Sequence, residues 1–107
     1  MAVSLDKGQQ LSLLRLDGEI GVTSAAEIKT SLLEALSAGK ETRIDLAHAT
    51  DLDVTAMQLL WAARQAFSVS GIKLALANPV PDPILSELRD MGFESFPLSV
   101  AETEVHS

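Results

Sequence analysis

The sequence contains no cysteine, and this absence excludes several kinds of chemistry at once. Without cysteine the chain has no disulfide bonds, no thiolate nucleophile and no cysteine-based zinc or iron–sulfur site. It also has no tyrosine, only one tryptophan and only three phenylalanines. With so few aromatic side chains, an exposed one becomes informative about a binding surface.

Long hydrophobic runs and basic residues are scarce as well. No apolar run approaches the ~20 residues that a membrane-spanning helix needs. The first residues lack the basic and apolar segments of a secretory signal, so we expect a cytoplasmic protein without direct membrane insertion. Eight basic against fifteen acidic residues give a net charge of −7. A surface of this sign repels phosphate backbones, and nucleic acid is therefore not expected as a partner.

The length and composition predict one compact domain. The 107 residues, of which 47% are hydrophobic, are enough for a single core and too few for two. No repeat or linker divides the chain. We expect one domain over residues 1–100, followed by a polar tail over residues 101–107.

The first half of the chain predicts a hairpin followed by a helix. Val3 and Leu5 alternate with polar residues, a turn follows, and a longer strand spans residues 11–20. Ser24 and Glu27 have the spacing of a capping box, and Gly39 stands at a C-cap position. These signals predict a helix over residues 25–38.

The second half predicts two further strands, each followed by a helix. A strand over residues 42–47 precedes a helix that begins at Val54, with Asp53 as its N-cap, and ends at Gly71. A strand over residues 72–77 then precedes a helix capped by Asp82, and residues 93–100 predict an edge strand. The fold class is therefore α/β in the order β-β-α-β-α-β-α. We expect a mixed four- to five-stranded sheet with helices mainly on one face.

Motifs that would indicate catalysis are absent from the sequence. It has no glycine-rich nucleotide loop, no nucleophile elbow and no zinc-binding histidine pair. We therefore expect no enzyme activity, no cofactor and no metal site.

One acidic segment stands apart between the strand over residues 42–47 and the next helix. Asp45, Asp51 and Asp53 surround this junction, and Thr55 occupies the second helical position. A phosphoryl group on Thr55 would be stabilised by the helix N-terminus. At ~6 Å and an effective dielectric near 20, it would repel one carboxylate by about 5 kcal/mol.

Two other interpretations of this segment remain open. In the first, Asp53 only caps the helix and Thr55 only fills its first turn. In the second, the three carboxylates hold Mg²⁺ in a small enzyme, because Mg²⁺ prefers oxygen ligands.

The helix that begins at Val54 also predicts a docking face. Its apolar arc consists of Ala56, Leu59, Leu60, Ala63 and Phe67, and a helical projection directs other residues away from this arc. The predicted partner-binding residues are Met57, Gln58, Trp61, Arg64 and Gln65. The alternative is that Trp61 packs under a loop or in a dimer contact.

The chain resembles a STAS domain of the type found in bacterial anti-sigma factor antagonists. The resemblance runs from about residue 3 to residue 98. It rests on the order and spacing of residues 16–20 (LDGEI), 44–47 (IDLA), 52–56 (LDVTA) and the strand after Gly71. Val54, Ala56 and Gly21 depart from the family pattern, which commonly has Ser, Gly and Asp at these positions.

This resemblance implies a non-catalytic switch in a partner-switching pathway. In the family, a partner serine kinase phosphorylates the hydroxyl residue two positions after the turn aspartate, and a phosphatase reverses the change. That position is Thr55 here, with Asp45, Asp51 and Asp53 as neighbours of the site. The partner would be an anti-sigma factor or serine kinase, and we expect a monomer or weak dimer. The alternative is a constitutive accessory subunit of a lipid transporter or a chemotaxis-associated complex, without phosphorylation.

Overall fold

The structure, a computed structural model, describes residues 3–93 and 96–101 of the chain. Strands and helices alternate along most of this length, which confirms the predicted α/β class. In chain order the elements are β1 (Val3–Lys7), β2 (Leu11–Leu16), β3 (Gly18–Ile20), the 3₁₀ turn η1 (Val22–Ser24), α1 (Ala25–Ala38), β4 (Glu41–Asp45), β5 (Ala49–Leu52), α2 (Val54–Ser70), β6 (Leu74–Leu76) and α3 (Asp82–Asp90).

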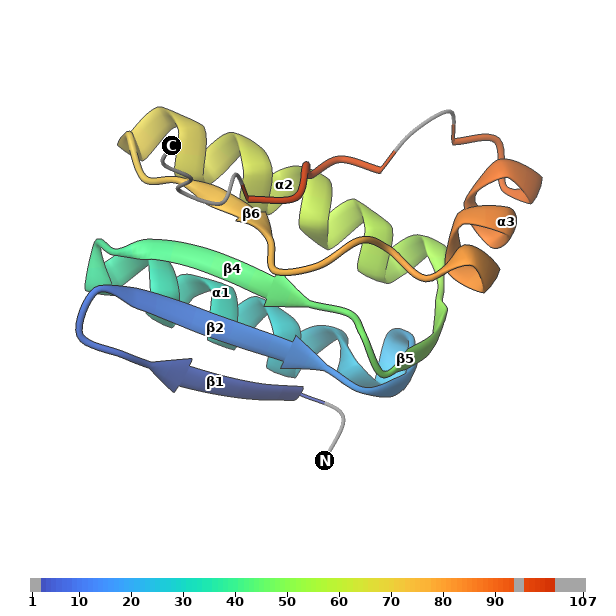
Figure 1. The fold of residues 1–107 in the computed structure, drawn as a ribbon, viewed down its shortest axis with the longest axis horizontal. Helices are drawn as coiled ribbons and strands as arrows, with labels where there is room; N and C mark the ends of the chain where they lie inside the picture. Colours follow the sequence, from blue (N-terminus) through green and yellow to red (C-terminus); the bar gives the residue numbers. More distant parts are fainter. Residues whose placement is uncertain (1–2, 94–95, 102–107) are drawn as a thin grey trace, which may run out of the picture.

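Four of the strands form one mixed sheet in the order β1-β2-β4-β6 (Figure 1). β1 and β2 form an antiparallel hairpin in which Leu5 lies opposite Leu14. β2, β4 and β6 are parallel to one another, and a helix lies in each connection between them. Parallel neighbours need such a crossover because the end of one strand and the start of the next lie at opposite ends of the sheet. The predicted hairpin and mixed sheet are thus confirmed.

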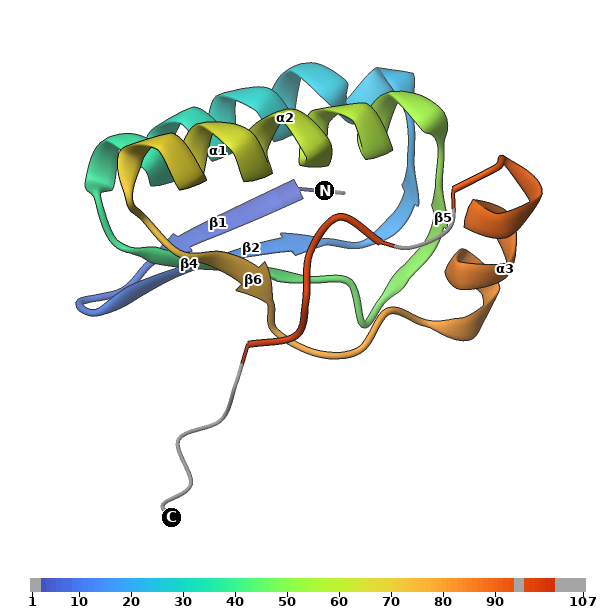
Figure 2. The same ribbon diagram turned by 90° about the horizontal axis from the view of Figure 1, so that it is seen from above.

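The core lies between this sheet and two of the helices. α1 and α2 lie side by side on one face, while α3 stands beside β5 at the end of the sheet (Figure 2). Leu14 and Ile44 alternate with more exposed strand residues and are fully buried, as are Ile28 of α1 and Phe67 of α2. Each such side chain stabilises the fold by about 1.5–3 kcal/mol. The expectation that helices cover mainly one face is confirmed.

The predicted continuous strand over residues 11–20 is wrong because the chain turns at Gly18. Gly18 has a φ of +73°, a left-handed conformation that glycine adopts without strain. After this turn β3 leaves the main sheet and pairs in parallel with β5, which the sequence did not predict. The Asp53 N–H donates to the Ile20 carbonyl at 3.1 Å. The small β3–β5 sheet therefore ends beside the first turn of α2.

Helix α1 has the predicted bounds but not the predicted cap. Gly39 ends it in the left-handed conformation, with a φ of +72°. The Ser24 side chain accepts no capping hydrogen bond, so the capping box with Glu27 is wrong. Ser24 belongs to η1 and already has helical backbone angles, whereas an N-cap residue needs an extended backbone to reach the next turn.

The C-terminal part differs from the predictions at several boundaries. β6 is shorter than the predicted strand over residues 72–77. α3 begins at Asp82 with Pro81 as its N-cap, so Asp82 is the first helical residue and its side chain makes no cap. In the described part of residues 93–100, one isolated bridge from Val100 to Leu76 replaces the predicted edge strand. The predicted tail lies outside the described residues except for Ala101.

Candidate functional site

The first turn of α2 is held by the cap that the sequence predicted. Asp53 has an extended backbone, and its Oδ1 accepts a hydrogen bond from the Ala56 N–H at 3.0 Å. This bond satisfies one of the donors that a helix N-terminus leaves free. Thr55 lies in this turn and is partly exposed. Thr55 is therefore within reach of a partner, and it lies close to the positive end of the helix dipole.

Gly21 approaches this cap from the neighbouring strand connection. A Cβ atom added at Gly21 would lie 3.1 Å from Asp53 Oδ2, which is closer than most such contacts. Residue 21 is thus next to the second oxygen of the capping carboxylate. Because it is glycine, this chain brings no further carboxylate to that position.

The three aspartates predicted as neighbours of Thr55 are dispersed in the structure. Asp45 ends β4, and strand alternation directs it to the face opposite buried Ile44, away from α2. Its Oδ1 accepts from the Ala47 N–H at 2.9 Å, and its Oδ2 lies 3.5 Å from Arg15 Nε. The hydrogen bond from Ala47 is the main cause of a lowered pKa of Asp45. Of the three, only Asp53 lies in contact with the first turn of α2.

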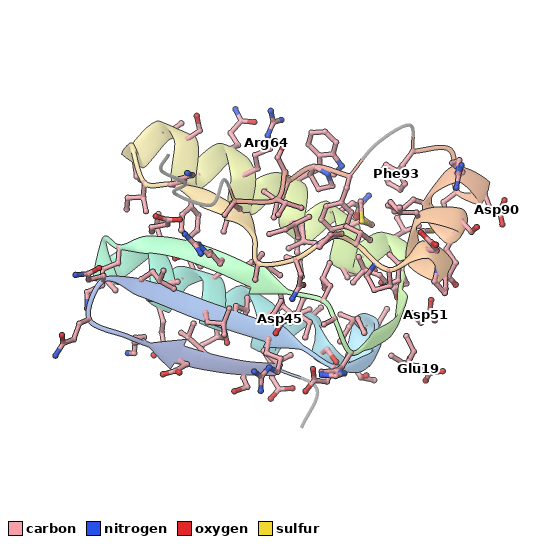
Figure 3. The ribbon with its side chains drawn as sticks, in the orientation of Figure 1. Glu19, Asp45, Asp51, Arg64, Asp90 and Phe93 are labelled. Carbon is pink, nitrogen blue, oxygen red and sulfur yellow. The ribbon has the colours of Figure 1, made fainter. Side chains whose placement is uncertain are left out.

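Asp51 faces α3 rather than Thr55. A hydrogen bond with the Asp51 carboxyl raises the pKa of Glu87 above its usual value, and burial and the negative charge of Asp51 add to this effect. Glu19 is the register partner of Asp51 on β3, and Figure 3 shows these two residues together at the end of the molecule, apart from Asp45. The carboxylates of β5 and α3 therefore form a contact between these two elements.

This contact contributes a loss of stability as the pH rises from acid toward neutral, opposite in sign to the contribution of the lowered pKa of Asp45. Folded Glu87 keeps its proton above the usual pKa of 4.5, whereas the unfolded chain has lost it. The shared proton stabilises the fold fully below that value, and this stabilisation is lost as the pH rises through the raised pKa. Glu87→Gln keeps a neutral hydrogen-bonding group beside Asp51, so the decline should flatten when melting temperature is followed against pH. Asp82→Asn, at an exposed residue of the same helix whose charge is not among the causes of the raised Glu87 pKa, is the control and should leave the decline in place.

The outer face of α2 carries most of the predicted partner-binding residues. Gln58, Trp61, Arg64 and Gln65 are all exposed, with Trp61 at 39%. Arg64 Cζ lies 5.5 Å from the centre of the Trp61 ring, which is the arrangement of a cation–π contact. This surface is open to a partner, as the helical projection predicted.

The prediction that Met57 belongs to this outer face is wrong. Met57 is fully buried, whereas Leu59, which was predicted for the core arc, is only partly buried. The buried arc of α2 consists of Ala56, Met57, Leu60, Ala63 and Phe67. Helix α1 packs against the Leu59 side of α2, where the two helices line a common hollow. Met57 lies on the opposite side of the arc, and the sequence pattern did not predict that this side is also covered.

Two apolar residues that sequence reasoning missed lie exposed on the segments that flank the cap. Val22, in η1, is 69% exposed, and Val54, the first residue of α2, is 43% exposed. Val54, Gln58 and Trp61 follow one another at the i, i+4, i+7 spacing of one helical stripe. That spacing was present in the sequence and would have extended the docking face to the N-terminus of α2.

Side chains that could bind a metal ion are not grouped together in the part of the chain that the structure describes. No three histidine or acidic side chains there could hold a metal ion together. The dispersal of Asp45, Asp51 and Asp53 explains this result. The Mg²⁺ interpretation thus lacks the cluster on which it rested.

Among residues 3–93 and 96–101, no helix is both long and apolar enough to cross a membrane.

Comparison with known proteins gives one family and a consistent set of folds. A family model described as the STAS domain matches residues 2–105. The anti-sigma factor antagonist SpoIIAA of Bacillus, in its unphosphorylated form, is 18% identical with a TM-score of 0.70, and the match covers 96% of this chain and 91% of that one. Its phosphorylated form gives a TM-score of 0.68 at 18% identity, covering 96% and 93%.

Two other solved structures extend this comparison. A putative anti-sigma factor antagonist from Thermotoga maritima is 16% identical with a TM-score of 0.72, covering 94% of this chain and 86% of that one. A protein named Mglu is 18% identical with a TM-score of 0.66 over 78% of this chain, which spans only 21% of the length of Mglu. No curated protein matches the sequence. At these identities the likeness is one of fold.

Proposed function

The chain belongs to the STAS domain family, and from this premise we propose that it is a non-catalytic switch in a partner-switching pathway. In this proposal it binds an anti-sigma factor or serine kinase in the cytoplasm and is released from it by phosphorylation of Thr55. A phosphatase restores binding. The fold likeness to anti-sigma factor antagonists, one of them known in unphosphorylated and phosphorylated forms, supports a role of this kind.

The observation that carries the proposal is the setting of Thr55. The residue is partly exposed, it follows the Asp53 cap, and Val54 beside it begins the exposed stripe that leads to Trp61. An exposed aromatic side chain near an exposed apolar one is typical of a protein-docking surface. A phosphoryl group on Thr55 would place a charge of about −1.5 to −2 at the edge of this surface. Docking would then require the removal of water from that charge, which opposes binding.

The phosphoryl group would come from ATP bound to the partner. The Thr55 hydroxyl oxygen forms the new bond to the γ-phosphorus, the bond to ADP breaks, and the hydroxyl proton passes to a base of the kinase. The protein itself then contributes the acceptor and its presentation at a helix N-terminus, where an anion is favourable. This division of roles is consistent with the absence of nucleotide motifs from the sequence.

We expect incubation with an anti-sigma-type serine kinase and ATP to add the mass of one phosphoryl group to the protein. Intact-mass spectrometry measures this addition, and the Thr55→Ala variant should remain at its unmodified mass. Thr50→Ala is the matched control, because Thr50 is an exposed threonine on β5 before the α2 cap. Phosphorylation that persists in Thr55→Ala, or that is lost only in Thr50→Ala, would contradict the assignment of Thr55.

Gly21 favours a second candidate function. Residue 21 lies against Asp53, and glycine there supplies no carboxylate beside the predicted acceptor. In this candidate the protein is a constitutive accessory subunit, for example of a lipid transporter or a chemotaxis-associated complex, and Thr55 is only a contact residue. Co-purification with an ATP-binding-cassette ATPase, together with unchanged binding by Thr55→Glu, would favour it over the switch.

A further inference from the structure

The outer edge of β6 is only partly covered by the chain. The Thr42 N–H donates to the Lys73 carbonyl at 2.9 Å, and the Ala77 N–H donates to the Ile44 carbonyl at 2.8 Å, so residues 73 and 77 face β4. Backbone groups alternate along a strand, and those of Leu74 and Leu76 consequently face outward.

The two outward-facing residues differ in their hydrogen bonding. Leu76 donates to Ser99 and accepts from Ala101, both at 2.8 Å, whereas Leu74 makes no backbone hydrogen bond on that side with any of residues 3–93 and 96–101. Within the described part of the chain, Leu74 is therefore left with one unpaired donor and one unpaired acceptor at the sheet edge.

A surface hollow of about 440 Å³ lies at this edge. It is bounded by the middle of α2, the start of β6 and the segment over residues 97–101, which lies beside β6 (Figures 1 and 2). Arg64 and Lys73 line it and both are exposed, while no carboxylate is found among its described lining residues. Leu98 and the 43% exposed Val100 give it an apolar side.

The charge of this hollow is opposite to that of the chain as a whole. Acidic residues outnumber basic ones by fifteen to eight, and three of the eight basic side chains form ion pairs in the described structure. Arg64 and Lys73 are not among these three, and Arg64 lies over the Trp61 ring. The cations of Arg64 and Lys73 and the unpaired backbone groups of Leu74 together form a site that suits an anionic peptide segment.

We propose that the edge of β6 at Leu74, together with Arg64 and Lys73, binds an extended acidic segment of a partner protein as an added strand. Such a segment satisfies the free N–H and C=O of Leu74 with its backbone. Because its side chains alternate between two sides, acidic residues on one side reach the cations while apolar residues on the other contact Leu98 and Val100. A small anion would leave the backbone groups of Leu74 unpaired.

This site is independent of the phosphorylation switch. β6 follows the C-terminal end of α2, whereas Thr55 lies in the first turn of that helix. Arg64 is the one residue shared with the predicted docking face. The edge site therefore survives if Thr55 proves to be no phosphoacceptor, and the switch survives if the edge binds nothing.

The test uses the full chain and a short fluorescent peptide of alternating valine and glutamate residues. Fluorescence anisotropy should report binding that weakens with added salt, and the same peptide with glutamine in place of glutamate should bind far more weakly. Lys73→Gln and Arg64→Gln should each weaken binding by up to about fivefold, as expected for an exposed ion pair. Lys29→Gln, at an exposed lysine on α1, is the matched control, and Thr55→Glu should also leave peptide binding unchanged.

The backbone contact is tested by Leu74→Pro. Proline removes the outward N–H of Leu74, together with a leucine side chain that packs against the core, and should reduce peptide binding. A peptide N-methylated at alternate residues makes the same test on the unaltered protein, so a variant that fails to fold does not decide the question.

Several results would overturn the proposal. These are no binding of the acidic peptide, equal binding of the N-methylated peptide, or equal competition by free glutamate or inorganic phosphate, which would indicate a small-anion site. Association of two copies through this edge in sedimentation would also overturn it. So would peptide binding that arises only after residues 102–107 are deleted, since the occupant would then be the chain itself.

Discussion

Replacement of Thr55 by glutamate should weaken the complex with the partner by roughly 100-fold, which corresponds to about 2.7 kcal/mol. The substitution puts a negative charge into the first turn of α2, beside the exposed Val54, which begins the stripe that leads to Trp61. A charge in an apolar interface opposes docking because water must be removed from it, and any carboxylate of the partner adds repulsion. Isothermal titration calorimetry against the purified partner measures the loss.

Thr55→Gln is the matched control for this prediction. Glutamine has the shape of glutamate without its charge, so the difference between the two variants isolates the electrostatic effect. Both variants should melt close to the unaltered protein, because Thr55 is partly exposed and the cap depends on Asp53 rather than on the Thr55 side chain. Equal affinities for Thr55→Glu and Thr55→Gln would show that charge at this position does not control binding.

The second large effect is on stability. Met57→Ala should lower the free energy of unfolding by about 2–5 kcal/mol, because it leaves a cavity under α2 at a side chain with no exposed surface. Domains of this size are stable by only about 5–15 kcal/mol, so a substantial fraction of the total is lost. Urea unfolding followed by circular dichroism measures this change, and the adjacent Gln58→Ala should stay within about 0.5 kcal/mol of the unaltered protein.

Trp61→Ala should give the opposite result to Met57→Ala. Trp61 is partly exposed at 39% and lies on the outer face of α2, so its removal should weaken partner binding by more than ~1 kcal/mol while changing stability little. The two substitutions lie four residues apart on one helix and separate binding from packing. A large loss of stability in Trp61→Ala with binding intact would place Trp61 in the core instead.

Local signals explain why the helices were predicted well. Asp53 can cap α2 and Gly71 can end it whatever the rest of the molecule does, because both act through backbone groups within a few residues. The same is true of Gly39 at the end of α1. Ser24 had the same kind of signal, but the backbone angles imposed by η1 prevented its cap.

Contacts between distant segments explain the predictions that failed. β5 is a strand only because β3 lies beside it, and nothing in residues 49–52 alone indicates that pairing. Asp45 and Asp51 are close to Asp53 in sequence, yet one points to the open face of the sheet and the other to α3. Their separation depends on strand alternation and on where α3 lies.

The sequence by itself determined the class of the fold, the bounds of α1 and α2, and the position of Thr55 behind a capping carboxylate. These features depend on hydrophobic periodicity and on caps, which act over less than one helix length. Only the tertiary structure decided that Met57 is buried, that Val22 and Val54 are exposed near the cap, and that Arg64 and Lys73 share one hollow. Burial and charge proximity are properties of segments brought together in space, and such contacts leave no periodic trace in a single chain.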